Sequence, residues 1–512
     1  MHALLGLDLG TTGVKAALFA ADDGRVLSTA FIEYPLFHPH PGWAEQDPAD
    51  WWQATISAIR TCLVGAVRHN IQPEDVRGIG LSGQMHGVVL LDEHHQVLRP
   101  CIIWADQRSE AQCRWITERV GAARLIELVS NPALPGFSAP KLLWIRDNEP
   151  EIFARARLML LPKDYIRFRL TGKLAMEISD AAGTCLLDVK QGTWSHEVLK
   201  AIELDPALLP PIVAADAICG TITEEVAALT DLLAETPVAG GGADNACGAV
   251  GNGVVRSGLA LVSIGTSGVV LAHAATPQVD LSGPVPRVHT FNHAVPRAWY
   301  LMGVTQGAGL SLRWVRDNIG LPERALERWT GLDAYELLAK EAEAVPAGSE
   351  GLIFLPYLQG ERTPHLDAYA RGGWIGLTAG HDRRHLIRAV LEGVAFSLKD
   401  CFAIIREQGL PIEQVCATGG GAKSQLWRQI IADVLGVELV TTSASEGPAF
   451  GAALLAGVAS GIYPSIQQAC ENTVHVLERT APRSGVEHIY AQAYETYRAL
   501  YPALKPIISR PL

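Results

Sequence analysis

The feature that most constrains the fold of this 512-residue chain is a short segment that occurs twice. Residues 7–14 read Leu-Asp-Leu-Gly-Thr-Thr-Gly-Val, and residues 262–269 read Val-Ser-Ile-Gly-Thr-Ser-Gly-Val. Each copy predicts a buried strand, a turn of glycine and small hydroxyl residues, and a second strand. Glycine lets such a turn approach a ligand closely, and successive N–H groups form a concavity that suits an anion. The repeat therefore favours two related domains around a cleft that holds a polyphosphate such as ATP.

The two copies differ at a position where chemistry is expected. Asp8 in the first copy corresponds to Ser263 in the second. A magnesium ion that accompanies a nucleotide needs oxygen ligands, usually including a carboxylate. The asymmetry predicts that Asp8 lies on the metal side of the cleft. Two glycine turns in separate α/β domains, with no shared ligand, remain the alternative.

Composition and charge narrow the class of protein. Hydrophobic residues make up 48% of the chain and charged residues 19%, as in an ordinary globular protein. The formal net charge of -12 argues against a nucleic-acid binder, which would present a basic face. Nine cysteines without a CxxC pair indicate buried thiols in a reducing compartment. With no basic leader and no long apolar run, we expect a cytoplasmic protein without a membrane span.

The chain is long enough for two large domains. A glycine-rich turn at 240–242 follows a short apolar strand, so we place the boundary near residue 237, between domains 1–236 and 237–512. Strands are expected at 3–9, 14–20, 25–30, 76–81 and 88–92, and helices at 51–67, 384–408, 424–435 and 489–504.

Asp244 is the leading candidate for a catalytic base. It follows an apolar strand and a glycine-rich turn, where α/β sheets usually place ligands. Phosphoryl transfer to an alcohol needs a carboxylate that accepts the hydroxyl proton. Asp244 suits that role, and Asn245 suits orienting a substrate hydroxyl. A loop aspartate in an Asx-turn is the competing interpretation.

Two further segments at strand ends suit a small polar ligand. In Gln-Met-His-Gly at 84–87, Met85 offers a packing surface and His86 a hydrogen-bonding group. The alternatives are a core methionine and a histidine bonded to backbone. Trp104 and Asp106 follow another strand and are also candidates for binding substrate, although Asp106 is equally suited to pairing with Arg108.

A third glycine-rich turn, Thr-Gly-Gly-Gly-Ala-Lys-Ser at 418–424, precedes an amphipathic helix. It lacks the spacing of a P-loop. Three glycines allow a flat ring or a ribose to lie against the backbone, which suits an adenosine site. A strand-to-helix turn packed by glycine is the alternative.

Together these segments resemble the FGGY family of carbohydrate kinases. The resemblance is carried by residues 8–15, 43–48, 84–87, 135–144, 161–165, 179–184, 243–246, 263–268, 360–365 and 419–422. The turn at 8–13 also occurs in actin and heat-shock chaperone ATPases, whereas Pro-Lys-Leu-Leu-Trp at 140–144 is specific to the sugar kinases. Residues 84–87 are most similar to family members that phosphorylate D-xylulose, because glycerol kinases have an arginine- and glutamate-containing segment there.

The resemblance implies an α/β fold of two ribonuclease-H-like domains, of the actin and sugar-kinase ATPase type, around a central cleft. It also implies ATP, bound mainly by the second domain, and Mg²⁺. Asp244 becomes the proton acceptor, Met85 and His86 a sugar-binding pair, and Asp8 a residue near the metal. The residues expected to bind the nucleotide are Thr11, Thr12, Lys15, Gly265, Thr266, Ser267, Gly419, Gly420, Gly421 and Ser424. Ala243 stands where many relatives have glycine, which adds only a methyl group.

The expected activity is ATP-dependent phosphorylation of D-xylulose at its 5-hydroxyl. A kinase for ribulose, gluconate or glycerol is the alternative within the class. A chaperone-like ATPase would need a peptide-binding domain, and little chain remains after residue 460; a sugar-sensing repressor would need a DNA-binding module before the first strand. The expected partners are a sugar and ATP, without nucleic acid or membrane, and a homodimer is left open.

Overall fold

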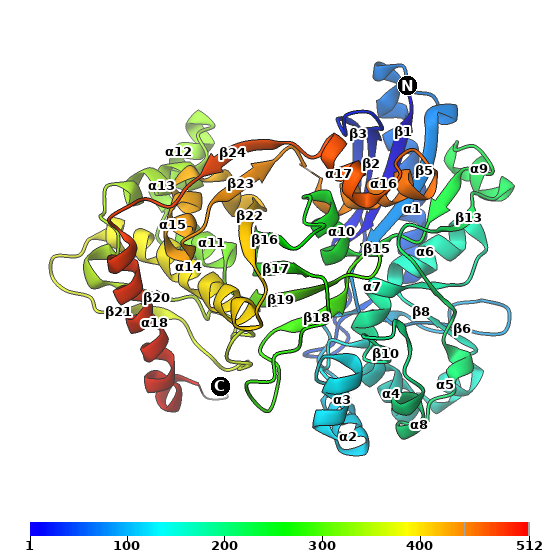
Figure 1. Cartoon of the computed structure of the whole chain (residues 1–512), viewed down its shortest axis with the longest axis horizontal. Coiled ribbons are helices and arrows are strands. Elements are labelled where there is room, and N and C mark those ends of the chain that lie inside the picture. Colours follow the sequence, from blue (N-terminus) through cyan, green and yellow to red (C-terminus); the bar gives the residue numbers. More distant parts are fainter. Residues whose placement is uncertain (445, 510–512) are drawn as a thin grey trace.

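The computed structural model describes residues 1–444 and 446–509. Two halves lie side by side (Figure 1), with the N-terminal half on the right in blue and cyan and much of the C-terminal half on the left in yellow and red. Each half is built around a mixed seven-stranded sheet. The expected two-domain α/β architecture is therefore confirmed.

The first sheet begins with the predicted antiparallel meander. Its strands, in spatial order, are β13 (Ile218–Thr221), β14 (Pro237–Ala239), β5 (Val76–Gly83), β1 (Ala3–Leu9), β2 (Gly13–Ala20) and β3 (Val26–Glu33), with β15 (Gly242–Ala243) paired to the end of β5. β5 runs parallel to β1, β14 and β15, whereas β2, β3 and β13 are antiparallel to their neighbours.

The second sheet repeats this pattern. Its order is β18 (His289–Asn292), β19 (Trp299–Thr305), β17 (Gly268–Ala274), β16 (Gly258–Ile264), β22 (Ile412–Thr418), β23 (Leu439–Thr442) and β24 (Val476–Thr480). From β19 to β24 the relative strand directions match those from β3 to β13. The two predicted hairpins, β1–β2 and β16–β17, occupy equivalent places in the two sheets, which confirms the duplication inferred from sequence.

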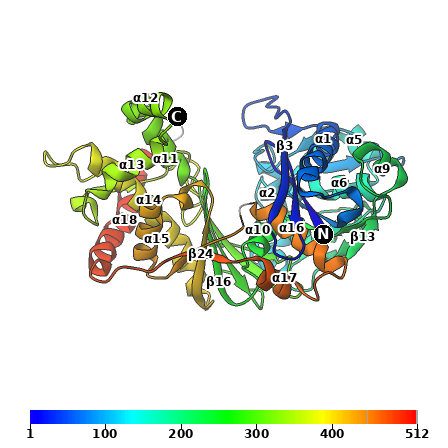
Figure 2. The ribbon, with the colours of Figure 1, turned by 90° about the horizontal axis from the view of Figure 1, so that it is seen from above.

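Helices bury both faces of the first sheet. On one face lies α1 (Pro48–Ala66), whose first turn is capped by Asp47. On the other lies α16 (Gly447–Ala459), which packs on β1 and β5 and against α10 (Asp244–Gly251). Glycine permits this packing, because a Cβ on Gly80 would lie 1.8 Å from the carbonyl oxygen of Ala452. Figure 2 shows α16, in orange, against the blue strands, so a late segment of the chain completes the N-terminal half.

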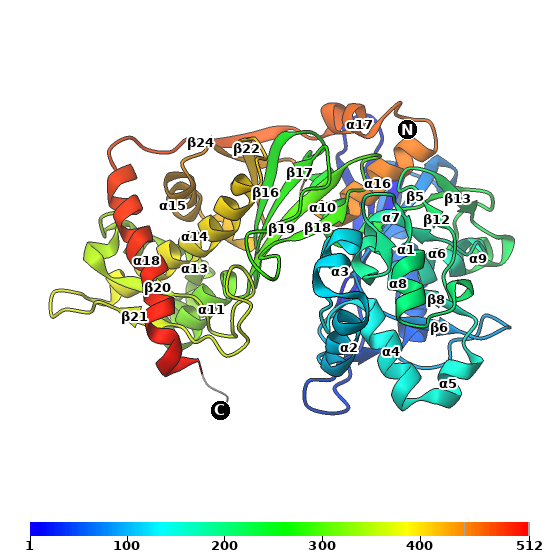
Figure 3. The same ribbon diagram turned by 60° about the horizontal axis from the view of Figure 1, so that its bottom comes forward.

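The other predicted helices are also present. α14 (Arg383–Glu407) and α15 (Gln425–Leu435) pack together in the C-terminal half, and α18 (Glu487–Ile508) lies on the side of that half away from the first sheet (Figure 3). A stripe of buried tyrosines at 490, 494, 497 and 501 fixes α18 there. Within residues 1–444 and 446–509, no helix is both long and apolar enough to span a bilayer.

Candidate active site

A cavity of about 890 Å³ lies between the two halves and is lined by residues of both. Of the residues singled out in the sequence, it is lined by Met85, His86, Trp104, Asp244, Asn245 and Ser267. The first sheet supplies Met85 and His86 after β5, and Asp244 and Asn245 after β15. The second sheet supplies Ser267 from its hairpin. Positions separated by more than 180 residues therefore meet in one cleft.

Asp244 is the first residue of α10, directly after β15. The turn that delivers it needs glycine at position 241, where φ is +77° and a Cβ would lie 2.1 Å from the carbonyl oxygen of Leu81. Oδ1 of Asp244 accepts hydrogen bonds from the backbone N–H of Asn245 (2.6 Å) and from its side-chain amide (2.9 Å). Burial, with the charge of Asp8 adding to it, raises the pKa of Asp244 to about 7. A carboxylate with that pKa is suited to accepting a proton near neutral pH.

Asp8 lies on β1, beside the first hairpin. Its Oδ1 accepts a hydrogen bond of 2.9 Å from Oγ of Ser82 on the neighbouring strand β5. Burial raises the pKa of Asp8, and this bond and Lys15 oppose the shift. Lys15 itself is held by an ion pair of 2.7 Å with Glu446.

The groups around Asp8 suit a magnesium ion that keeps water and phosphate ligands, and not a metal ion that is coordinated by protein side chains alone. In the part of the chain that the structure describes, no three histidine, cysteine or acidic side chains gather as a metal site. Magnesium in nucleotide sites is usually held by one or two carboxylates, phosphate oxygens and water. A buried carboxylate whose burial disfavours the charged form is also stabilised by a nearby cation. Asp8 is therefore a suitable protein ligand for such an ion.

His86 is held in a conformation that is unusual for a residue other than glycine, with φ of +72°. Its Nδ1 lies 2.7 Å from the carbonyl oxygen of Gly183 and donates to it, which leaves Nε2 as an acceptor. Burial lowers the pKa of His86 well below its usual value, so the ring is neutral. The histidine thus bonds to backbone, as one interpretation of the sequence required, and also lines the cavity.

Three other predicted substrate residues have different surroundings. The side-chain nitrogen of Asn245 lies 3.8 Å from the sulfur of Met85, so α10 touches the loop after β5. Nε1 of Trp104 donates to Oγ1 of Thr11 at 2.9 Å. Asp106 is fully buried, accepts hydrogen bonds from Arg108 and the N–H of Ala44, and does not line the cavity. Met85, Asn245 and Trp104 therefore line one cavity, whereas Asp106 is buried outside it.

A second cavity of about 440 Å³ adjoins the second hairpin. The predicted nucleotide residues that line it are Gly265, Thr266, Gly420, Gly421 and Ser424. Gly419 does not line the cavity. It packs against the backbone of Ile264, where a Cβ would lie 2.8 Å from the carbonyl oxygen. Ser424 also caps α15 by accepting a hydrogen bond from the N–H of Trp427. Three of its lining residues are thus glycines from the two turns expected to bind the nucleotide.

The sequence reasoning missed several residues that line these cavities. Asp333, Tyr335 and Glu336 complete the second cavity, and Glu361 and Arg362 line the cleft. Glu361 accepts hydrogen bonds from Oγ1 of Thr305 and from two backbone N–H groups, and burial raises its pKa to about 8. The available signal for Glu361 and Arg362 was the sequence Gly-Glu-Arg-Thr-Pro at 360–364.

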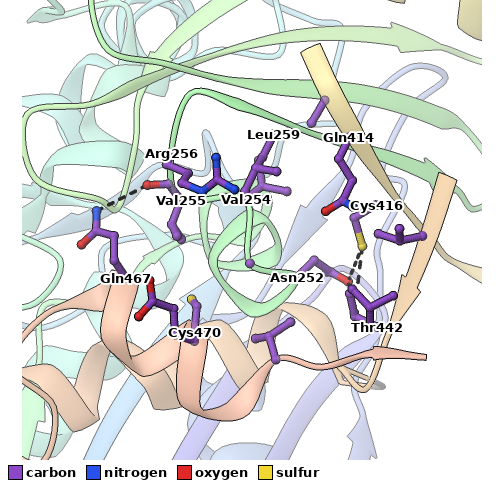
Figure 4. A pocket seen from close by; sticks show the side chains of 16 residues that line it. Asn252, Val254, Val255, Arg256, Leu259, Gln414, Cys416, Thr442, Gln467 and Cys470 are labelled. Atoms are coloured by element: carbon purple, nitrogen blue, oxygen red, sulfur yellow. Dashed lines mark hydrogen bonds between the residues drawn. The ribbon is translucent and has the colours of Figure 1, made fainter. Parts of the chain in front are cut away.

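A third, smaller cavity of about 200 Å³ lies where the chain passes from α10 to β16. Figure 4 shows Asn252, Cys416 and Thr442 joined by hydrogen bonds on one side of it, and Gln467 bonded to the carbonyl of Val255 on the other. None of the predicted site residues lines it. The chemistry expected from the sequence therefore belongs to the other two cavities.

Comparisons with known proteins agree with this geometry. Residues 3–251 match the model of the N-terminal domain of the FGGY family of carbohydrate kinases, and residues 260–460 match its C-terminal domain. The chain is 40% identical to the xylulose kinase of Bacillus subtilis strain 168 over 507 residues, which cover 99% of this chain and 98% of that protein. It is 40% identical to the xylulose kinase of Escherichia coli K12 over 506 residues, 99% and 100% of the two chains.

A solved structure of a similar protein has the same fold as this chain. The crystal structure of a xyloylose kinase from Brucella ovis superposes with a TM-score of 0.89 at 39% identity. The match covers 99% of this chain and 100% of that one, so both halves and their sheets are shared.

Proposed function

This chain belongs to the FGGY family of carbohydrate kinases, and we propose that it transfers the γ-phosphoryl group of ATP to the 5-hydroxyl of D-xylulose. The observation that carries the proposal is the cleft that places Met85, His86 and Asp244 in one cavity with the second hairpin. Relatives that match the chain over nearly its whole length are xylulose kinases. D-xylulose 5-phosphate and ADP are the products.

The sugar binds against the first half of the cleft. Nε2 of His86 accepts a hydrogen bond from a sugar hydroxyl, because Nδ1 is already committed to Gly183. The side-chain amide of Asn245 holds a second hydroxyl, and Met85 and Trp104 supply packing surface. A neutral histidine suits a neutral sugar, since neither partner then loses charge solvation on binding.

Asp244 accepts the proton of the 5-hydroxyl as its oxygen attacks the γ-phosphorus. The new O–P bond forms, the bond between the γ-phosphorus and the β–γ bridging oxygen breaks, and ADP leaves with that electron pair. Asn245 holds Oδ1 of Asp244 by two hydrogen bonds, which leaves Oδ2 to take the proton. A base with a pKa of about 7 can later release this proton to water.

The phosphates bind between the hairpins. Backbone N–H groups in the turns that contain Thr11, Thr12, Thr266 and Ser267 are suited to the β- and γ-phosphates. A magnesium ion held beside Asp8 neutralises phosphate charge in such reactions. The adenosine part rests against Gly420 and Gly421 in the second cavity.

We assign sugar binding mainly to the half built on the first sheet, which extends past the expected boundary at 237 through β14, β15 and α10, and ATP binding mainly to the half built on the second sheet. Met85 and His86 come from the first half, and the glycine turn at 419–421 from the second. The nine cysteines in the described chain are free and buried, which suits a reducing cytoplasm, where we place the enzyme.

A panel of sugars tests the proposed substrate. ADP release is coupled to a reporter enzyme with D-xylulose, ribulose, gluconate or glycerol as acceptor. The highest kcat/KM is expected with D-xylulose. A higher value with any of the other three would move the chain to the alternative kinase, and ADP release unaffected by all four sugars would support an ATPase.

A further inference from the structure

Two segments that the sequence singled out without assigning a role, 161–165 and 179–184, meet directly behind the loop that carries Asp244. Side chains of these segments, with those of the nearby Arg167 and Glu177, form a buried charge cluster that consists of Lys163, Asp164, Arg167, Glu177 and Asp180, all with side chains 0% exposed. Lys163 and Arg167 lie on α6 (Pro162–Thr171), Glu177 ends β9 (Met176–Glu177), and Asp180 lies on α7 (Ile178–Ala181).

Lys163 is the centre of the buried charge cluster. Its Nζ lies 2.8 Å from Asp164, 3.3 Å from Asp180 and 3.8 Å from Glu177. Arg167 pairs with Asp164 at 2.6 Å. Two cations face three carboxyl groups that are shielded from solvent, and burial raises the pKa of Asp180 well above its usual value, which favours a proton on Asp180. Such a core is costly to desolvate, which weakens the interpretation that it serves stability alone.

Hydrogen bonds connect the buried charge cluster to residues 240–243, the loop directly before Asp244, in two places: once directly and once through Ser179. Nη1 of Arg167 donates to the carbonyl oxygen of Gly240 at 2.7 Å. At the other end of the loop, the N–H of Ala243 donates to Oγ of Ser179 at 3.0 Å, and this hydroxyl donates to Glu177 at 2.7 Å. Hydrogen bonds thus hold residues 240–243 at both ends, directly before Asp244. We call this arrangement the clasp.

We propose that the buried charge cluster, acting through Ser179 and Arg167, sets the position of the Asp244 carboxylate over the sugar hydroxyl. The inference rests on the proposed function, because it assumes that Asp244 is the base. Ser179 and Arg167 are positioning residues: neither lines the cleft, and each acts on the backbone that delivers Asp244. Small displacements of a base from its productive geometry cost rate far more than they cost binding.

Ser179→Ala tests the clasp by removing the acceptor of the Ala243 N–H. The expected result is a fall in kcat of roughly 10- to 100-fold, with the KM values for sugar and ATP within two-fold of wild type. Water that reaches a loosened Asp244 lowers its pKa, so the acid limb of the kcat/KM profile moves to lower pH. Ser179→Thr, which keeps the hydroxyl, restores part of kcat.

Thr55→Val is the matched control. Thr55 is a fully buried residue on α1 whose hydroxyl donates to the carbonyl of Trp51, in the same helix, at 2.7 Å. Thr55→Val loses one buried side-chain hydrogen bond, whereas Ser179→Ala loses two, and it is expected to keep wild-type kcat. If Ser179→Ala lowers kcat no more than this control and leaves the pH profile unmoved, the proposal is overturned.

Arg167→Lys covers the case in which Ser179→Ala does not fold. It keeps a positive charge beside Asp164 but replaces the guanidinium, which bonds Asp164 and the carbonyls of Gly240 and Ala175 at once, with a single ammonium on a shorter side chain. The bond to Gly240 should weaken, and the same loss of kcat at constant KM is expected. Wild-type kcat in this protein would contradict the proposal. All variants are assayed with the sugar that the wild-type enzyme prefers. An incorrect substrate assignment is then detected with the wild-type enzyme alone, and the comparison of the variants with wild type still tests the clasp.

Discussion

Trp104 donates a hydrogen bond of 2.9 Å from its indole nitrogen to Oγ1 of Thr11. Trp104 lines the cleft, whereas Thr11 belongs to the turn of the first hairpin. One bond thus joins the proposed sugar site to the turn that we propose to bind phosphate, although the two residues are 93 positions apart. Sugar and phosphate sites built from one connected frame can hold the hydroxyl and the γ-phosphate in line.

The sugar-binding role proposed for His86 predicts a substrate-specific defect. His86→Ala should raise the KM for D-xylulose or lower kcat/KM by roughly 10- to 100-fold, because the sugar hydroxyl loses its acceptor. The KM for ATP should stay within two-fold. Steady-state kinetics with each substrate varied separately measures both, and a variant that only melts at a lower temperature with unchanged kinetics would show that His86 is a structural histidine.

The position of Asp8 predicts a defect in the use of the metal. Asp8→Ala should raise the Mg²⁺ concentration needed for half-maximal activity and lower kcat, while D-xylulose binding stays near wild type. Magnesium titrations of activity, paired with calorimetric titration of the sugar without nucleotide, separate the two effects. Lost sugar affinity with normal magnesium dependence would place Asp8 in the sugar site instead.

The raised pKa of Asp244 predicts how activity depends on pH. The carboxyl must be ionised to accept a proton, so kcat/KM should rise with pH through an acid limb near 7. A profile measured from pH 5 to 9 shows the limb directly. If kcat/KM is flat down to pH 5, then Asp244 either has an ordinary pKa or is not the base.

The same shift predicts an effect on stability. Folded Asp244 holds its proton up to a pH of about 7, whereas the unfolded carboxyl loses it near 3.8, so this group's contribution to the free energy of unfolding falls as the pH rises between these values. Asp244→Asn removes that loss, so at pH 8 the variant should be more stable than wild type by ~1 kcal/mol or more. Urea unfolding at pH 8 and pH 4 checks this: the gain should shrink at pH 4, and equal gains at both would contradict it.

The fold was largely predictable because its main signals are local. The paired turns at 10–13 and 265–268 predicted both hairpins, and the apolar periodicity of 384–408 predicted α14. The packing of α16 on the first sheet could not be predicted in this way. It depends on glycines such as Gly6 and Gly80 that admit a helix backbone, and their partners lie more than 350 residues away.

Residues that line the cleft were predicted correctly where they follow the end of a strand, as Asp244 and His86 do. Asp106 shows the limit of that rule: it also follows a strand, but Arg108 and the N–H of Ala44 take its carboxylate away from the cavity. Glu361 and Arg362 were not predicted as site residues because they lie on an irregular loop after β20 (Ile353–Leu355) and not directly at the end of a strand. The buried charge cluster was hidden because charged residues in sequence ordinarily indicate a solvated surface.

A single-turnover measurement with the Asp244→Asn variant tests the central claim most directly. ATP labelled at the γ-phosphate is mixed with an excess of enzyme and saturating D-xylulose, and labelled D-xylulose 5-phosphate is quantified over time. The account predicts transfer slower than wild type by roughly 10²- to 10⁴-fold, with ATP and sugar affinities unchanged. Transfer to D-xylulose at the wild-type rate by a well-folded Asp244→Asn protein would contradict it.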